Sequence, residues 1–278
     1  AVAPVFPISN LYPTDSTARA KSASAVIASS YSTNADSEAK LADAKWTPAV
    51  FKSTRSMVLT HPAQCMPIFP LGDLNIEGSD ADRQLIQNTL SELECMGTGF
   101  WCGYSFAWLA CLGARIREPN RVLWALNQYL DGFMSPNTFH LNGDYKRTGA
   151  SRFHYRPFTL EGNFGAAHAV NEMLLQSWGD RIRLFPAVPT EWRDVAFTDL
   201  RGEGAFVISA WRKDGVFARA EILSEKGCPI RLEHPAPHHS ILVKEKGGEP
   251  LGLFRPNAEI SFKTRPGHRY RLEKKEIL

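Results

Sequence analysis

The segment from Phe158 to Gly165, FTLEGNFG, holds a single acidic residue, Glu161, at a glycine-bounded turn. A carboxylate in such a turn can accept a proton from water, and the glycines let a substrate approach the backbone closely. The same residue also precedes a helix-like run, where a negative charge stabilises the helix N-terminus by about 0.3–1 kcal/mol. At this point Glu161 can be interpreted as a general base or as a helix-end carboxylate.

Two further segments carry side chains that suit a polar ligand. His61 and Gln64 stand in the run THPAQCMPIFPLGDL, whose prolines fix the loop and can hold recognition residues in place. A lone histidine before a proline is also a common surface or cap residue. Trp101, Tyr104 and Trp108 stand in GTGFWCGYSFAW. Such rings stack on the apolar faces of sugars, and packing in a core is the alternative.

A fourth segment, residues 139–158, concentrates hydrogen-bonding side chains in one predicted loop. This density either fixes a polyhydroxylated ligand or forms a solvated surface. The side chains in question are His140, Asn142, Asp144, Arg147, His154 and Arg156.

The elements that must position these residues are helices in the first two thirds of the chain. A cap at Thr14 or Asp15 predicts one helix, and SDADRQLIQNTLSELECMG, from Ser79 to Gly97, predicts another. Further helices are expected over residues 104–118, 119–134 and from about Asn163 to Trp178; the first of these is apolar nearly all round and so should be packed on several sides.

After residue 190 the pattern changes from helical spacing to alternation. Six short runs, from GAFVISAWRK to HRYRLEK, are divided by glycine, proline and aspartate and predict six to eight antiparallel strands. We therefore expect a helical domain over residues 1–190 and a β-domain over residues 191–278. Five or six helices are about half of what a closed α/α toroid needs, so the helical part is either an open array or a portion of a longer protein.

Composition narrows the function classes. With 44% hydrophobic residues among 278, the chain can bury a core, and its net charge of +3 is spread along the chain, which argues against nucleic-acid or membrane partners. No apolar run approaches the roughly 20 residues of a membrane span. The five cysteines form no C-x-x-C pair, and G-x-S-x-G, P-loop, dinucleotide and H-E-x-x-H motifs are absent. We therefore predict no metal and no cofactor.

Taken in order, HPAQCMPIFPLGD, GTGFWCGYSFAW, RPFTLEGNFG, NEMLLQS and LFPAVPTEW resemble the C-terminal half of glycoside hydrolase family 95, the α-L-fucosidases with some enzymes acting on α-L-galactosides. The resemblance covers about residues 57–215. It implies the second half of an α/α six-fold toroid followed by a C-terminal antiparallel β-sandwich, and a reaction that inverts the anomeric centre.

Carried over by position, Glu161 matches the aspartate that serves this family as catalytic base, and Gln64 falls where a second histidine is usual. Glutamate for aspartate lengthens the arm by roughly 1.5 Å, which matters because an inverting enzyme keeps its two carboxyl groups about 6.5–9.5 Å apart. The general acid has no counterpart in this chain. The expected substrate contacts are His61, Gln64, Trp101, Asn163 and His154.

The resemblance also implies partners and a location. A glycan substrate and the missing N-terminal half of the same protein are the expected partners, and the expected location is secreted or periplasmic. Two alternatives stay open. One is a non-catalytic carbohydrate-binding relative, and the other is another toroid enzyme such as a polysaccharide lyase, whose cleft would cluster Arg, His and Tyr as the loop from His140 to Arg156 does.

Overall fold

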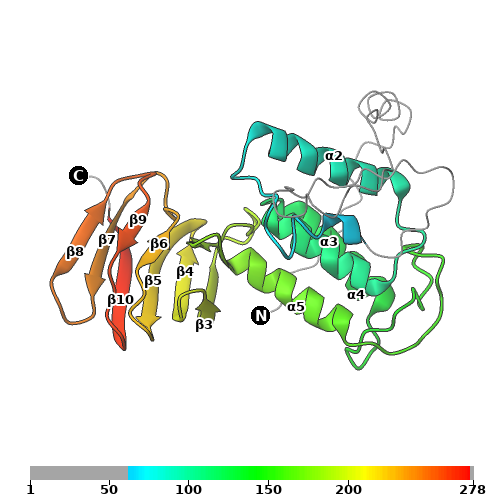
Figure 1. The fold of residues 1–278 in the computed structure, drawn as a ribbon. Coiled ribbons are helices and arrows are strands. Elements are labelled where there is room, and N and C mark those ends of the chain that lie inside the picture. Colours follow the sequence, from blue (N-terminus) through cyan, green and yellow to red (C-terminus); the bar gives the residue numbers. More distant parts are fainter. Residues whose placement is uncertain (1–61, 276–278) are drawn as a thin grey trace, which may run out of the picture.

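The computed structural model describes residues 62–275, in which helices and β-sheets occupy separate halves (Figure 1). The helix predicted after Thr14 or Asp15 and the side chain of His61 lie outside these residues. After a short turn, η2 (Ala63–Cys65), the helical half contains α2 (Asp80–Met96), α3 (Gly103–Arg115), α4 (Pro119–Phe133) and α5 (Glu161–Leu174). Helices are therefore confirmed at all four predicted places in the described part of the chain.

Local sequence explains where these helices begin. Ser79 and Asp82 form a capping box at the start of α2: each side chain accepts a hydrogen bond from the backbone N–H of the other. Pro119 occupies the first turn of α4, where a missing N–H costs nothing. Ten of the 13 residues of α3 are buried, as its apolar sequence predicts, and it packs between α4 and α5.

The last helix ends earlier than predicted. We expected it to continue to Trp178, but α5 ends at Leu174 and the next four residues form β1 (Leu175–Trp178). These residues pair with β2 (Arg181–Leu184) in an antiparallel hairpin. A long-range strand partner thus overrides the helical spacing of the sequence, and the change from helix to strand falls well before residue 190. The division into domains at residue 190 stays a prediction.

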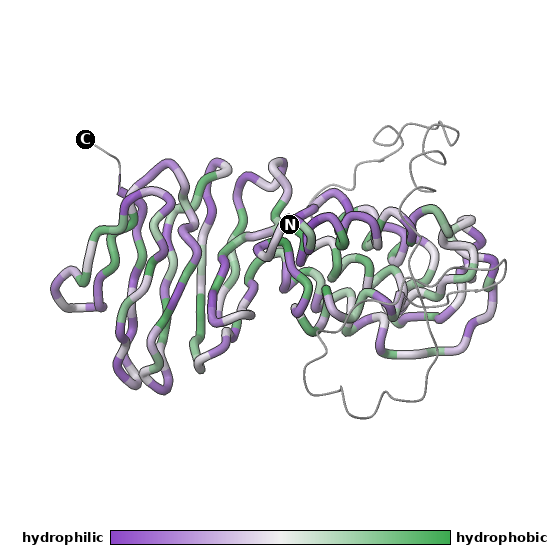
Figure 2. The backbone as a smooth tube through the Cα atoms, turned by 45° about the horizontal axis from the view of Figure 1, so that its top comes forward, coloured by the Kyte–Doolittle hydropathy of each residue, from purple (hydrophilic) through white to green (hydrophobic). Residues whose placement is uncertain are grey.

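The β-half contains two sheets, in which hydrophilic and hydrophobic residues alternate along the strands (Figure 2). Every pairing in the larger, six-stranded sheet is antiparallel. Every pairing among the strands after residue 190 is antiparallel, as predicted. In the described residues the smaller sheet also contains a parallel pairing, between β6 (Ile230–Leu232) and β2, which lies before residue 190; Ile182 stands opposite Leu232. In spatial order, the larger sheet is β3 (Val195–Gly202), β4 (Phe206–Lys213), β5 (Val216–Ser224), β10 (His268–Lys275), β7 (Ser240–Glu245) and β8 (Pro250–Phe254), and the smaller is β1, β2, β6 (Ile230–Leu232) and β9 (Ile260–Phe262).

One hydrophobic core serves both sheets and another serves the helices. Buried side chains of the smaller sheet, such as Ile182 and Leu232, belong to the same cluster as Ile208 and Ile222 of the larger sheet. Within residues 62–275, no helix has the length and apolarity that crossing a membrane requires.

A charged network joins the two halves. The side chain of Arg183, in β2, is 2% exposed, stacks on the Trp178 ring at 3.8 Å, and makes two hydrogen bonds of 2.6 and 2.7 Å to the Glu77 carboxylate before α2. Arg117, after α3, bonds Glu77 and also Glu233, after β6. Burial alone would raise the pKa of Glu77, but these arginines outweigh it and hold the pKa below its ordinary value.

Candidate active site

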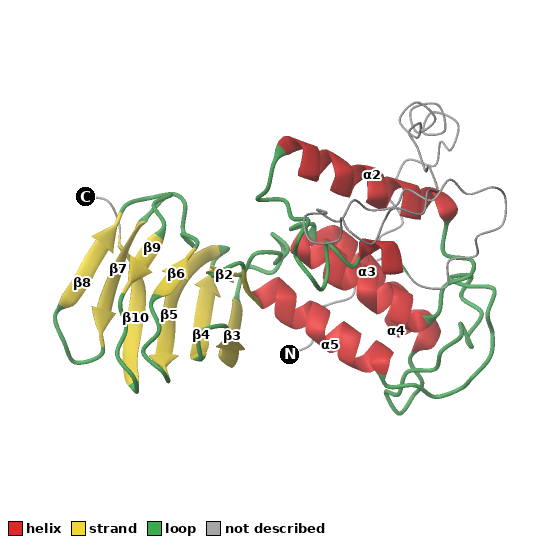
Figure 3. Ribbon diagram, in the orientation of Figure 1, coloured by secondary structure: helices red, strands yellow, loops and turns green. Residues whose placement is uncertain are grey.

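Glu161 is the first residue of α5, at the end of the helical half that lies away from the sheets (Figure 3). Its side chain is exposed. The preceding residue, Leu160, supplies no side-chain hydrogen bond to the helix end. The carboxylate therefore reaches solvent beside the partial positive charge of a helix N-terminus. This placement suits both interpretations of Glu161.

A second helix N-terminus meets the same place. Helices α3 and α5 run side by side in the same direction, since Gly103 lies by Gly162 across the His140 ring and Arg115 bonds Glu172 near the other ends. The positive ends of two helix dipoles therefore converge near Glu161.

Buried polar rings lie beneath this convergence. Tyr129, from α4, and His140 are both 0% exposed, and their ring centroids are 5.4 Å apart. Burial raises the pKa of Tyr129 and the Glu161 charge adds to this, whereas burial lowers the pKa of His140 against the opposing effect of Glu161. Burial and then nearby charges, including Glu161, also raise the pKa of Tyr104, from α3. The charge of Glu161 therefore acts on groups from two helices, α3 and α4, and from the loop that follows α4.

The loop between α4 and α5 is organised by two side chains. The carboxylate of Asp144, 0% exposed, accepts hydrogen bonds from the backbone N–H groups of Thr148, Gly149 and Ala150 at 3.0–3.1 Å. Burial would raise the pKa of Asp144, but these hydrogen bonds prevail and lower it. Asn163 accepts from the His140 backbone N–H at 2.8 Å and donates to the Thr138 carbonyl at 2.9 Å. Both ends of its amide therefore support the turn.

Exposed aromatic residues stand on both sides of Glu161 in the sequence. Phe139 and Phe158 are 47% and 51% exposed, and their centroids lie 4.9 Å apart. Phe164, one turn into α5, is 67% exposed. Rings with free faces suit the apolar face of a sugar. We did not single out these residues from the sequence, where nothing separates an exposed phenylalanine from a core one.

The other predicted site residues have mixed placements. Trp101 is 3% exposed and packs on Phe106 in the helical core, so its ring has no free face for a ligand. The placement of Trp101 therefore fits the alternative interpretation, which was packing in a core. His154 is exposed in the loop. Gln64 lies half-buried in η2, and in the part of the chain that the structure describes no hydrogen bond or ring contact links it to Glu161.

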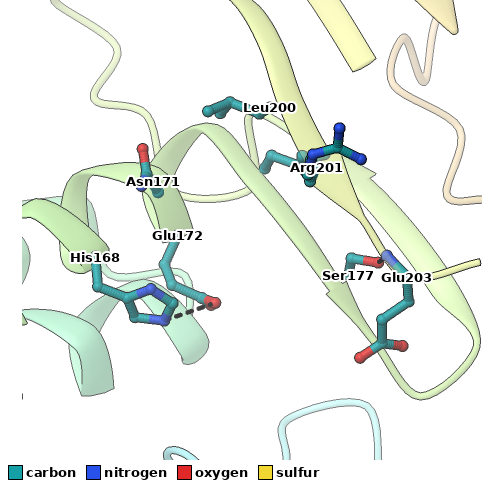
Figure 4. A pocket seen from close by; sticks show the side chains of 8 residues that line it. His168, Asn171, Glu172, Ser177, Leu200, Arg201 and Glu203 are labelled. Carbon is teal, nitrogen blue, oxygen red and sulfur yellow. Dashed lines mark hydrogen bonds and ion pairs between the residues drawn. The ribbon is translucent and has the colours of Figure 1, made fainter. Parts of the chain in front are cut away.

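A polar hollow of about 370 Å³ occupies the opposite end of α5, where it meets the sheets (Figure 4). Glu172 is buried there and bonds Arg115 at 2.6 Å, with His168 3.4 Å away. Burial would raise the pKa of Glu172, but the His168 and Arg115 contacts lower it. Glu172 is therefore held in an ion pair, which leaves Glu161 as the acid of α5 that is exposed to a ligand. Among residues 62–275, no group of three His, Cys, Asp or Glu could hold a metal ion.

An exposed carboxylate in a segment with exposed aromatic rings, on a helical unit joined to β-sheets, suits the class of glycoside hydrolases. Two models of one family match the chain: the glycosyl hydrolase family 95 catalytic domain over residues 54–174, and the glycoside hydrolase family 95 C-terminal domain over residues 176–272. The chain belongs to glycoside hydrolase family 95, as its motifs predict.

A curated relative agrees with this assignment. The chain is 26% identical over 173 residues to alpha-L-fucosidase 2 of Arabidopsis thaliana, an alignment that covers 62% of this chain. The aligned part is 20% of that protein, so the chain spans about a fifth of the length of this relative.

Proposed function

We propose that this chain supplies the catalytic base of an inverting glycoside hydrolase that acts on α-L-fucosides or related α-L-galactosides. The observation that carries the proposal is the exposed Glu161 carboxylate at the meeting point of two helix N-termini, with the exposed rings of Phe158 and Phe164 three residues before and after it in the sequence. The name of the Arabidopsis relative supplies the substrate class.

In the proposed reaction, Glu161 removes a proton from a water molecule as that water attacks the anomeric carbon. The bond from this carbon to the leaving oxygen breaks, and a general acid protonates that oxygen. The acid belongs to a part of the protein beyond this chain, about 6.5–9.5 Å from the base. The side chain of glutamate is longer than that of aspartate by roughly 1.5 Å. The backbone around Glu161 must therefore lie correspondingly farther from the substrate.

The same proposal gives the described helices a place in a larger architecture. Helices α2 to α5 form part of an α/α toroid that an N-terminal portion of the protein completes, and the two sheets form a C-terminal β-sandwich. His61, Gln64 and His154 contact the glycan in this proposal, and Asn163 acts through the turn that it supports. We propose a secreted or periplasmic location on the family resemblance alone.

The test is the release of L-fucose from 2′-fucosyllactose by the full-length protein and by Glu161→Gln. Loss of a general base is expected to lower kcat about 10²–10⁴-fold. Asp80→Asn is the matched control, because Asp80 is likewise the first residue of its helix, α2. If Glu161 only stabilised a helix end, both variants would lose about 0.3–1 kcal/mol of stability and keep their activity.

Two other outcomes would favour the alternatives. Binding of the oligosaccharide without any release of fucose by the wild type would indicate a carbohydrate-binding relative. An unsaturated sugar among the products of a uronate-containing glycan, detected by its ultraviolet absorbance, would indicate a lyase.

A further inference from the structure

Two buried polar atoms next to Glu161 have no role in the proposed reaction. Within residues 62–275, neither Nε2 of His140 nor the Tyr129 hydroxyl has a hydrogen-bond partner, although both side chains are 0% exposed. Buried polar groups in native proteins are nearly always bonded, and exceptions often mark functional sites. His140 in particular must be held where it is by something that outweighs this cost.

The bonds of His140 reach the chain on both sides of Glu161. Its ring Nδ1 lies 2.8 Å from Oγ1 of Thr159, and its carbonyl accepts a hydrogen bond of 3.3 Å from the Thr159 N–H. Its own N–H donates to Oδ1 of Asn163 at 2.8 Å. Thr159 and Asn163 stand two residues before and two residues after Glu161.

Two glycines make room for the imidazole ring. A Cβ atom on Gly162, the second residue of α5, would lie 2.5 Å from Nδ1 of His140. A Cβ atom on Gly103, the first residue of α3, would lie 2.2 Å from Nε2. The ring thus fills the gap between the starts of α3 and α5, and any other residue at either position would displace it.

This arrangement favours one position for the proton on the ring. Nδ1 has an oxygen within hydrogen-bond distance, whereas Nε2 faces the Gly103 backbone and has no acceptor in the described chain. We therefore assign the proton to Nδ1, from which it is donated to Thr159. A proton on Nε2 would bury a donor without a partner.

We propose that His140 is the positioning residue of the Glu161 base: its ring and backbone tie Thr159 and Asn163 together and so fix the direction of the carboxylate. This inference rests on the proposed function. The helix end has no side-chain cap of its own, because Leu160 occupies the cap position. The first turn of α5 is therefore oriented by the His140 contacts. A loss of these contacts moves the base relative to the water that it activates, and a displacement of about 1 Å can lower the rate about 10²-fold.

The test uses the full-length protein and separates kcat from KM. Thr159→Val removes the hydroxyl at nearly constant volume, and Thr159→Ser restores it. His140→Asn keeps a polar nitrogen near the position of Nδ1, whereas His140→Gln places its amide near Nε2. We expect Thr159→Val and His140→Gln to lower kcat about 10–100-fold with little change in KM. Thr159→Ser and His140→Asn should recover part of that loss.

A matched control addresses the general effect of the threonine substitution. Thr89→Val also deletes a hydroxyl that bonds a backbone carbonyl, that of Leu85 at 2.8 Å in α2, and should leave kcat and KM unchanged. If Thr159→Val and His140→Gln keep the wild-type kcat while the wild type and Glu161→Gln differ as proposed, the positioning inference alone is wrong. If the wild type releases no fucose, the proposed function fails and this inference falls with it.

Discussion

The fit of His140 between two helix ends predicts the effect of a single added methyl group. In Gly103→Ala, the new Cβ would lie 2.2 Å from Nε2 of His140 and 2.9 Å from Cβ of Phe133. Both neighbouring side chains are 0% exposed, and hydrogen bonds hold His140 in place, so neither can move away freely.

The expected magnitude follows from two opposing effects. Overpacking of a core costs about 1–3 kcal/mol, and the upper end applies because the new atom approaches three side-chain atoms within 3 Å. Replacing glycine by alanine in a helix stabilises the helix by about 1 kcal/mol. The net loss is about 2 kcal/mol, which lowers the melting temperature by about 4–8 °C in a domain of 150–250 residues.

Gly99→Ala is the control for this experiment. Gly99 belongs to the same segment, GTGFWCG, but the nearest atom to its added Cβ would be Nε of Arg152 at an ordinary 3.5 Å. The free energy of unfolding of this variant should equal that of the wild type or exceed it by up to about 1 kcal/mol, because alanine lowers the entropy of the unfolded chain. Urea denaturation of both variants measures the difference. Equal stability of Gly103→Ala and Gly99→Ala would refute the packing of His140 between α3 and α5.

Three further predictions concern the rest of the described chain. The pKa of Glu77 is lower in the folded protein than in the unfolded chain, so the native state binds fewer protons. The stability that Glu77 contributes is therefore present above about pH 4.3 and is lost as the pH falls through the folded pKa. Glu77→Gln should flatten this part of a plot of unfolding free energy against pH. Asp144→Asn should destabilise the loop by about 1–3 kcal/mol, seen as faster proteolysis between α4 and α5, whereas unchanged cleavage would show that its backbone bonds do not hold the loop. Among the described cysteines, the exposed Cys95 should react with a thiol reagent at neutral pH. Cys65 is buried, which raises the pKa of its thiol to about 12, so it should stay protected until the protein unfolds. Labelling of Cys65 in the native protein would contradict this.

The helices were predictable because their signals are local. The capping box at Ser79 and Pro119 at the start of α4 each act within one turn, and the apolar sequence of α3 by itself indicates burial on all sides. The end of α5 was not predictable in the same way. Residues 175–178 continue the helical spacing, and only their pairing with residues 181–184 and the sheet beyond makes them a strand.

The site shows the same division between local and distant causes. Glu161 and Asn163 could be found from a short segment around a glycine-bounded turn. The burial of His140 could not, because it depends on Gly103 and Gly162, which are distant from each other in the sequence and from the histidine. Trp101 illustrates the converse, since an aromatic residue beside glycines suits a sugar and a core equally well until its packing is known.

Chemical rescue of Glu161→Ala tests the role of Glu161 as a base most directly. Azide carries its own negative charge and needs no base to attack an anomeric carbon, so it can replace the activated water if the remaining machinery is intact. In the full-length protein, we predict that Glu161→Ala releases no fucose from an α-L-fucoside in buffer and that azide restores turnover, with a β-L-fucosyl azide as the product. A folded Glu161→Ala variant that hydrolyses the fucoside at the wild-type rate without azide would contradict the assignment of Glu161 as the base.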